Sequence, residues 1–154
     1  MTAKISEARV AVYELEVKIN APRAAVWKGL VEDTDAWWLH DFHMVGEGST
    51  VTLDARAGGH LIESHEDGRS LLWFTVTNCV PGVQLDASGG LSPQFGGPAT
   101  TMITIKLEEL DGGGTTLRMT DALFGRVPEE TIRALDEGWK LLFTEGLKKY
   151  VEGQ

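Results

Sequence analysis

The sequence predicts an α+β fold in which one antiparallel sheet curves around a long C-terminal helix. Two observations indicate it. Apolar and polar residues alternate along several short segments separated by glycine-rich turns, and an apolar stripe with helical spacing runs through residues 128–151. The strand segments follow one another without helices between them, which is typical of an antiparallel sheet and not of the strand–helix alternation of a parallel one.

The strands are recognised by a period of two. Leu15, Val17 and Ile19 are apolar between polar neighbours, and the same alternation recurs in segments 50–56, 103–108 and 116–120. Such a pattern buries one face of a strand and leaves the other in water. Together with the segments between the remaining glycine turns, it predicts a sheet of about seven strands.

Two short helices are expected after the first strand. The first begins at Pro22, a residue suited to the first helical turn. The second covers residues 33–38, with Asp33 or Thr34 as its N-cap.

The long C-terminal helix is expected from Pro128 to about Val151. Acidic residues lie in its first turn and lysines in its last, which matches the helix dipole. Its apolar stripe consists of Ile132, Leu135, Trp139, Leu142, Phe143, Gly146 and Tyr150.

Two glycines lie inside this helix, Gly138 and Gly146, each at a cost of about 1 kcal/mol relative to alanine. Gly146 lies on the stripe, where the missing side chain indicates either room beneath the helix or close packing against another element.

The overall charge excludes several classes of partner. The chain has 154 residues, with 14 Lys and Arg against 23 Asp and Glu, for a net charge of −9. Such a surface repels phosphate backbones and anionic lipids, so we expect no nucleic-acid partner and no membrane.

Cys79 is the one cysteine, so neither an intrachain disulfide nor a cysteine zinc cluster can form. With no signal-like or spanning segment visible, we expect a cytoplasmic protein of one domain, residues 1–154.

The aromatic and buried polar residues are the candidates for a binding site. Aromatic walls with a few convergent polar groups are how small-molecule cavities are lined, although such aromatics also fill ordinary cores. The candidate walls are Trp37, Trp38, Trp73, Phe95, Trp139 and Phe143, and the candidate polar contacts are His60, Glu63 and Asp121.

The orientation of these polar residues is open. Whichever face of segment 60–65 looks inward, it brings either His60 or Glu63 to the concave side of the sheet. Asp121 is in phase with Leu117 and Met119 and would point inward, unless the strand ends at Thr120 and the carboxylate is solvated.

Other catalytic signatures are absent. The four histidines (His40, His43, His60 and His65) lack the spacing of a metal site, and we expect no metal and no cofactor. No serine elbow, Cys–His signature or phosphate loop occurs. The segment 91–98 is long enough to be either a lid over a cavity or an ordinary hairpin loop.

Five segments in this order resemble the SRPBCC superfamily. They are VKINAPRAAVWKGLVEDTDAWW (17–38), GGHLIE (58–63), VTNCVPGVQL (76–85), GGGTTLRMTDALFG (112–125) and EGWKLLFTEGLKKYVEG (137–153). More narrowly, they resemble the branch named for the activator of the heat-shock chaperone ATPase. The resemblance implies the helix-grip fold of birch-pollen-allergen-like and START domains, with a deep cavity between sheet and helix for an apolar molecule. The sequence departs from the branch at Asp121, where a histidine is frequent, and at His60, where an arginine is frequent.

The resulting hypothesis is a protein that binds a small apolar or aromatic molecule. An alternative is a cyclase- or hydratase-type enzyme that uses a cavity carboxylate or histidine as general acid–base. A third is a domain that modulates a chaperone ATPase, as the branch name suggests. The sequence leaves open whether the chain forms a homodimer.

Overall fold

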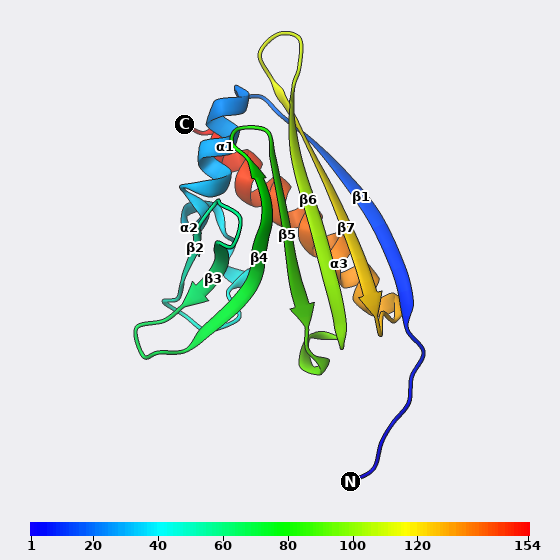
Figure 1. The fold of residues 1–154 in the computed structure, drawn as a ribbon. Coiled ribbons are helices and arrows are strands. Elements are labelled where there is room, and N and C mark those ends of the chain that lie inside the picture. Colours follow the sequence, from blue (N-terminus) through cyan, green and yellow to red (C-terminus); the bar gives the residue numbers. More distant parts are fainter.

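The computed structural model describes all 154 residues and contains one seven-stranded antiparallel sheet curved around a C-terminal helix (Figure 1). The sheet order is β1-β7-β6-β5-β4-β3-β2, so the first strand pairs with the last. The predicted α+β helix-grip fold is confirmed. The strands are β1 (Arg9–Ile19), β2 (Thr50–Leu53), β3 (His60–Ser64), β4 (Ser70–Val80), β5 (Gln84–Leu91), β6 (Ala99–Glu109) and β7 (Thr115–Gly125).

Two short helices, α1 (Arg23–Val31) and α2 (Thr34–Trp37), connect β1 to the rest of the sheet, followed by the 3₁₀ turn η1 (His40–Phe42). Helix α1 begins one residue later than predicted, and Pro22 is its N-cap in an extended conformation. Asp33 occupies the N-cap position of α2, as predicted, but neither it nor Thr34 makes a side-chain cap hydrogen bond. The carboxylate of Asp33 instead accepts hydrogen bonds from Lys28 and Tyr150, and the hydroxyl of Thr34 donates to the carbonyl of Leu30.

The C-terminal helix is continuous from α3 (Glu129–Leu141) through a π-helical segment η3 (Leu142–Lys148) to α4 (Lys149–Glu152). The predicted extent is therefore confirmed, while the wider turns of η3 were not foreseen. Short π-helical insertions are rare in proteins as a whole, and those that occur are often located at functional sites. Four residues of η3 are buried: Leu142, Phe143, Gly146 and Leu147. No helix of the protein is long and apolar enough to cross a bilayer.

Strand β7 runs past Thr120 to Gly125, which decides the orientation of Asp121. In the register of β1 and β7, Leu15 lies opposite Met119 and Tyr13 lies opposite Asp121. Because side chains of a strand alternate between faces, Asp121 shares the concave face with Met119. It is 1% exposed.

The two helix glycines have different surroundings. A Cβ atom on Gly146 would lie 2.6 Å from the carbonyl oxygen of Trp37, so the helix packs against the backbone of α2 and leaves no room there. A Cβ atom on Gly138 would lie 3.4 Å from Cε1 of Phe42, an ordinary contact distance.

Alanine substitutions should therefore change stability in opposite directions. We expect Gly138→Ala to raise the free energy of unfolding by up to about 1 kcal/mol, because the helix loses a flexible residue without a clash. Gly146→Ala should lower it by about 1–3 kcal/mol, because the new methyl group must displace α2. Urea unfolding followed by circular dichroism measures both. Equal effects of the two substitutions would contradict the packing difference.

Candidate functional site

A cavity of about 500 Å³ lies between the concave face of the sheet and helix α3. Thirteen of its twenty lining residues are hydrophobic. Helix α3 forms one wall, β4 and the turn after α2 form another, and the loop that follows β5 forms part of the mouth. The volume is within the range of about 300–1,000 Å³ found for small-molecule sites.

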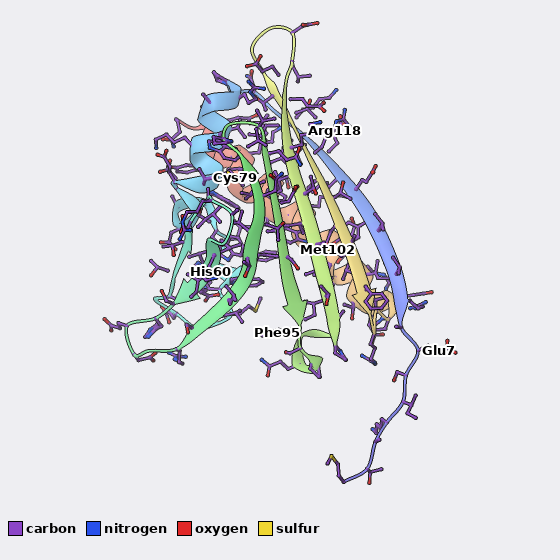
Figure 2. The ribbon with its side chains drawn as sticks, in the orientation of Figure 1. Glu7, His60, Cys79, Phe95, Met102 and Arg118 are labelled. Atoms are coloured by element: carbon purple, nitrogen blue, oxygen red, sulfur yellow. The ribbon has the colours of Figure 1, made fainter.

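The structure brings five of the nine candidate site residues to this cavity. Its lining includes Trp38, Trp73, Phe95, Asp121 and Trp139. Phe95 lies at the end of the sheet where β5 leads into β6, in the turn η2 (Pro93–Phe95), and is 39% exposed (Figure 2). Segment 91–98 thus contributes to the mouth, and the hydroxyl of Thr131 on α3 contacts the carbonyl of Gly96 at 3.4 Å.

Two other candidates lie deeper. Trp37 and Phe143 line a separate apolar void of about 30 Å³, and their ring centroids are 6.2 Å apart. Trp38, Phe74 and Trp139 line both spaces and so form the wall between them. Trp37 and Phe143 are therefore placed in the core beneath the cavity.

The remaining two candidates do not line the cavity. His60 is exposed, because Leu61 and Glu63 occupy the inner face of β3. Glu63 is buried at 0% exposure and contacts two residues of the lining, the indole nitrogen of Trp73 at 3.3 Å and the backbone nitrogen of Met44 at 3.0 Å.

Asp121 is the buried carboxylate of the cavity. Its Oδ2 accepts hydrogen bonds of 2.9 Å from the hydroxyl of Tyr13 and from the indole N–H of Trp139. The hydroxyl of Thr101 donates to Oδ1. The three donors come from β1, α3 and β6, so one carboxylate joins the helix to two strands that flank β7.

The phenol of Tyr13 remains a donor at neutral pH. Burial and, after it, the negative charge of Asp121 raise its pKa well above the ordinary value, because both disfavour a phenolate at this position. Tyr13 therefore serves the carboxylate as a hydrogen-bond donor and cannot act as a base.

Tyr13 and Thr101 were missed by the sequence analysis. Tyr13 is in phase with Leu15, and Thr101 is in phase with Ile103, so both were recognisable as inward-facing positions. What the alternation did not indicate is that both lie beside Asp121, which depends on the register across three strands.

Glu63 organises the segment that precedes β2. Its Oε1 accepts from the backbone N–H of Met44 at 3.0 Å, and its Oε2 accepts from that of Val45 at 2.8 Å and from the hydroxyl of Ser49 at 2.6 Å. Burial raises the pKa of Glu63, but the hydrogen bonds from Ser49, Val45, Met44 and Trp73 outweigh it and the pKa is lowered.

Glu63 also orients part of the cavity wall. Its contact to Trp73 fixes the indole of that residue, which packs edge-on against Trp38 with ring centroids 5.4 Å apart. The indole N–H of Trp38 donates to the carbonyl of Phe42 at 3.1 Å. Both tryptophans are thus held at their polar ends and present their rings to the cavity.

A second, polar hollow of about 310 Å³ lies outside this wall, between α2 and β2. It is lined by Asp35, His40, His43 and the 46–49 turn. Nδ1 of His43 lies 2.8 Å from the hydroxyl of Ser49. No group of three or more His, Cys, Asp or Glu side chains has a geometry that could hold a metal ion.

Comparison with known proteins defines the fold class. The chain matches no family model and no curated protein sequence. Among solved structures it is similar to an uncharacterised protein from Rhizobium leguminosarum, with 20% identity, a TM-score of 0.73 and coverage of 98% of this chain and 100% of that one. It is also similar to Ara h 8.0201, with 16% identity, a TM-score of 0.67 and coverage of 95% and 100%.

A third similar structure is CalU16 from Micromonospora echinospora, with 18% identity, a TM-score of 0.61 and coverage of 95% and 87%. At these identities the likeness shows the fold, which is the helix-grip fold that the resemblance implied. The narrower resemblance to the chaperone-ATPase-activator branch stays a prediction.

Replacing Glu63 tests its anchoring role. At pH 7 we expect Glu63→Gln to lower the free energy of unfolding by about 1–3 kcal/mol, because an amide cannot accept all the hydrogen bonds that a carboxylate accepts. The folded-state pKa lies below the ordinary 4.5, so the carboxylate stabilises the protein above that pH. This contribution is lost as the pH falls below 4.5 towards the folded-state pKa, and the difference from wild type should shrink there.

Urea unfolding between pH 3 and 7 measures this difference. Glu47→Gln is the matched control, because it removes an exposed carboxylate from the same segment. An equal loss in both variants, or a Glu63→Gln difference that does not change with pH, would contradict the anchoring role.

Proposed function

We propose that this protein binds a small, largely apolar or aromatic molecule in the cavity between the sheet and helix α3. The observation that carries the proposal is the cavity itself, about 500 Å³ in volume and lined mainly by hydrophobic side chains. A space of this size, with one buried carboxylate at its wall, is typical of a ligand site.

The aromatic lining supports a ligand with a flat or bulky apolar body. Trp38, Trp73 and Trp139 all line the cavity, and Trp139 stacks on Phe143 with an interplanar angle of 12°. Because these rings are already held by their neighbours, ligand binding would cost little side-chain entropy.

The alternative is an enzyme of the cyclase or hydratase type, and the observation in its favour is the carboxylate of Asp121 in the cavity. A general acid–base mechanism needs a group that can take up or release a proton near neutral pH. Tyr13 is held in its protonated form, and no histidine or lysine lines the cavity. These features favour binding over acid–base catalysis.

A neutral fluorescent probe tests the binding function. N-phenyl-1-naphthylamine emits strongly only in apolar surroundings, and we expect saturable binding to the wild-type protein. Gly138→Phe should weaken this binding about tenfold or more, because the new ring extends from α3 into the cavity. Glu137→Phe is the matched control, because it introduces the same ring at an exposed neighbouring position outside the lining.

Two results would contradict the proposal. One is the absence of saturable binding to the wild-type protein. The other is an equal affinity in Gly138→Phe and wild type, with circular dichroism showing both to be folded.

A further inference from the structure

We infer that the ligand of this cavity carries a protonated amine at its buried end, attached to an aromatic or aliphatic body. This inference rests on the proposed binding function and specifies the class of molecule bound. It follows from the charge and hydrogen bonds of Asp121 and from the aromatic lining of the cavity.

The first step is the missing counter-ion. Asp121 is 1% exposed, yet it takes part in none of the ion pairs of the protein. Its three donors, Tyr13, Thr101 and Trp139, are all neutral. A buried charge is costly unless it is paired, so a cation beside Asp121 would gain more than one at the protein surface.

The second step is a free acceptor position. A carboxylate has about four lone-pair directions. Oδ2 of Asp121 already accepts two hydrogen bonds, from Tyr13 and Trp139, whereas Oδ1 accepts one, from Thr101. Asp121 lines the cavity, so a ligand donor can take the remaining position.

The third step is the charge of the lining. Asp121 and, at the first turn of α3, Glu130 are the charged residues among the lining positions, and no Lys, Arg or His is present. The net charge of −9 has the same sign. A cleft lined by one sign of charge concentrates ligands of the opposite sign and repels those of its own. The carboxylate of a ligand such as a fatty acid would be repelled by that of Asp121, because no cation of the lining lies between them.

The fourth step is the aromatic surroundings. Trp139 contributes its N–H to Asp121, and its ring lines the cavity together with Trp38 and Trp73. Indole faces attract cations, by about 0.5–1 kcal/mol at exposed sites and more when the cation is desolvated. The ring systems that accommodate the apolar body thus also favour an ammonium group near them.

Three probes that share one ring system and differ in their head groups test this inference. They are 2-(1-naphthyl)ethylamine, 2-(1-naphthyl)ethanol and 1-naphthylacetate, titrated by calorimetry at pH 7. In the wild-type protein we expect the amine to bind about tenfold or more tightly than the alcohol, since hydrogen bonds to charged groups are the stronger kind. The acid should bind most weakly.

Asp121→Asn should reduce the preference for the amine over the alcohol to about twofold or less, because the charge is removed at nearly constant shape. Asp86→Asn is the matched control. Asp86 lies on β5 between the inward-facing Leu85 and Ala87, bonded to Asn78 and Gln84 and outside the cavity lining, so its loss should leave the preference unchanged.

The outcomes separate this inference from the proposed function. Equal affinities for amine and alcohol in the wild-type protein, or tighter binding of the acid, would overturn the amine inference while leaving apolar binding intact. Failure of all three probes and of N-phenyl-1-naphthylamine would overturn both. If circular dichroism shows that Asp121→Asn does not fold, the ranking of the three head groups in the wild-type protein decides.

Discussion

One buried carboxylate joins the C-terminal helix to the sheet beside the cavity. Asp121 on β7 accepts hydrogen bonds from Tyr13 on β1, Thr101 on β6 and Trp139 on α3. A donor N–H or O–H buried without an acceptor costs about 1–3 kcal/mol, so the three donors depend on this carboxylate as much as it depends on them. The position of Trp139, and with it one wall of the cavity, is a consequence of this cluster.

The helix meets its surroundings differently at its two ends, and this produces the cavity. At η3, Gly146 allows the backbone to approach the carbonyl of Trp37, where a Cβ atom would lie at only 2.6 Å. At α3, Trp139 of the helix lies against Phe74 of β4 with ring centroids 5.9 Å apart, and these two large side chains line the cavity together with Trp38. Close packing at one end and large side chains at the other leave a space that opens beside α3.

The sheet and the long helix were predictable from local patterns. The alternation of apolar and polar residues follows from the burial of one face of a strand, and the apolar stripe follows from the burial of one face of the helix. The site was predictable only in part, because it depends on how elements meet. On β3 both faces carry apolar residues, Leu61 on one and Ile62 on the other, so the pattern could not decide between Glu63 and His60. Tyr13 and Asp121 are far apart in sequence and adjacent only through the register of β1 and β7. The spacing of apolar residues does not distinguish the π-helical turns of η3 from α-helical ones.

The two buried carboxylates, Glu63 and Asp121, differ in how many of their hydrogen-bond acceptor positions are filled by donors of the protein. Glu63 has two donors on each oxygen: Met44 and Trp73 on Oε1, and Val45 and Ser49 on Oε2. With about four lone-pair directions, it has no position left, and it lies outside the cavity lining. Asp121 lines the cavity and has three donors, so one of its acceptor positions has no donor within the protein. The same chemical group therefore anchors a loop at Glu63 and joins the helix to the sheet beside the cavity at Asp121.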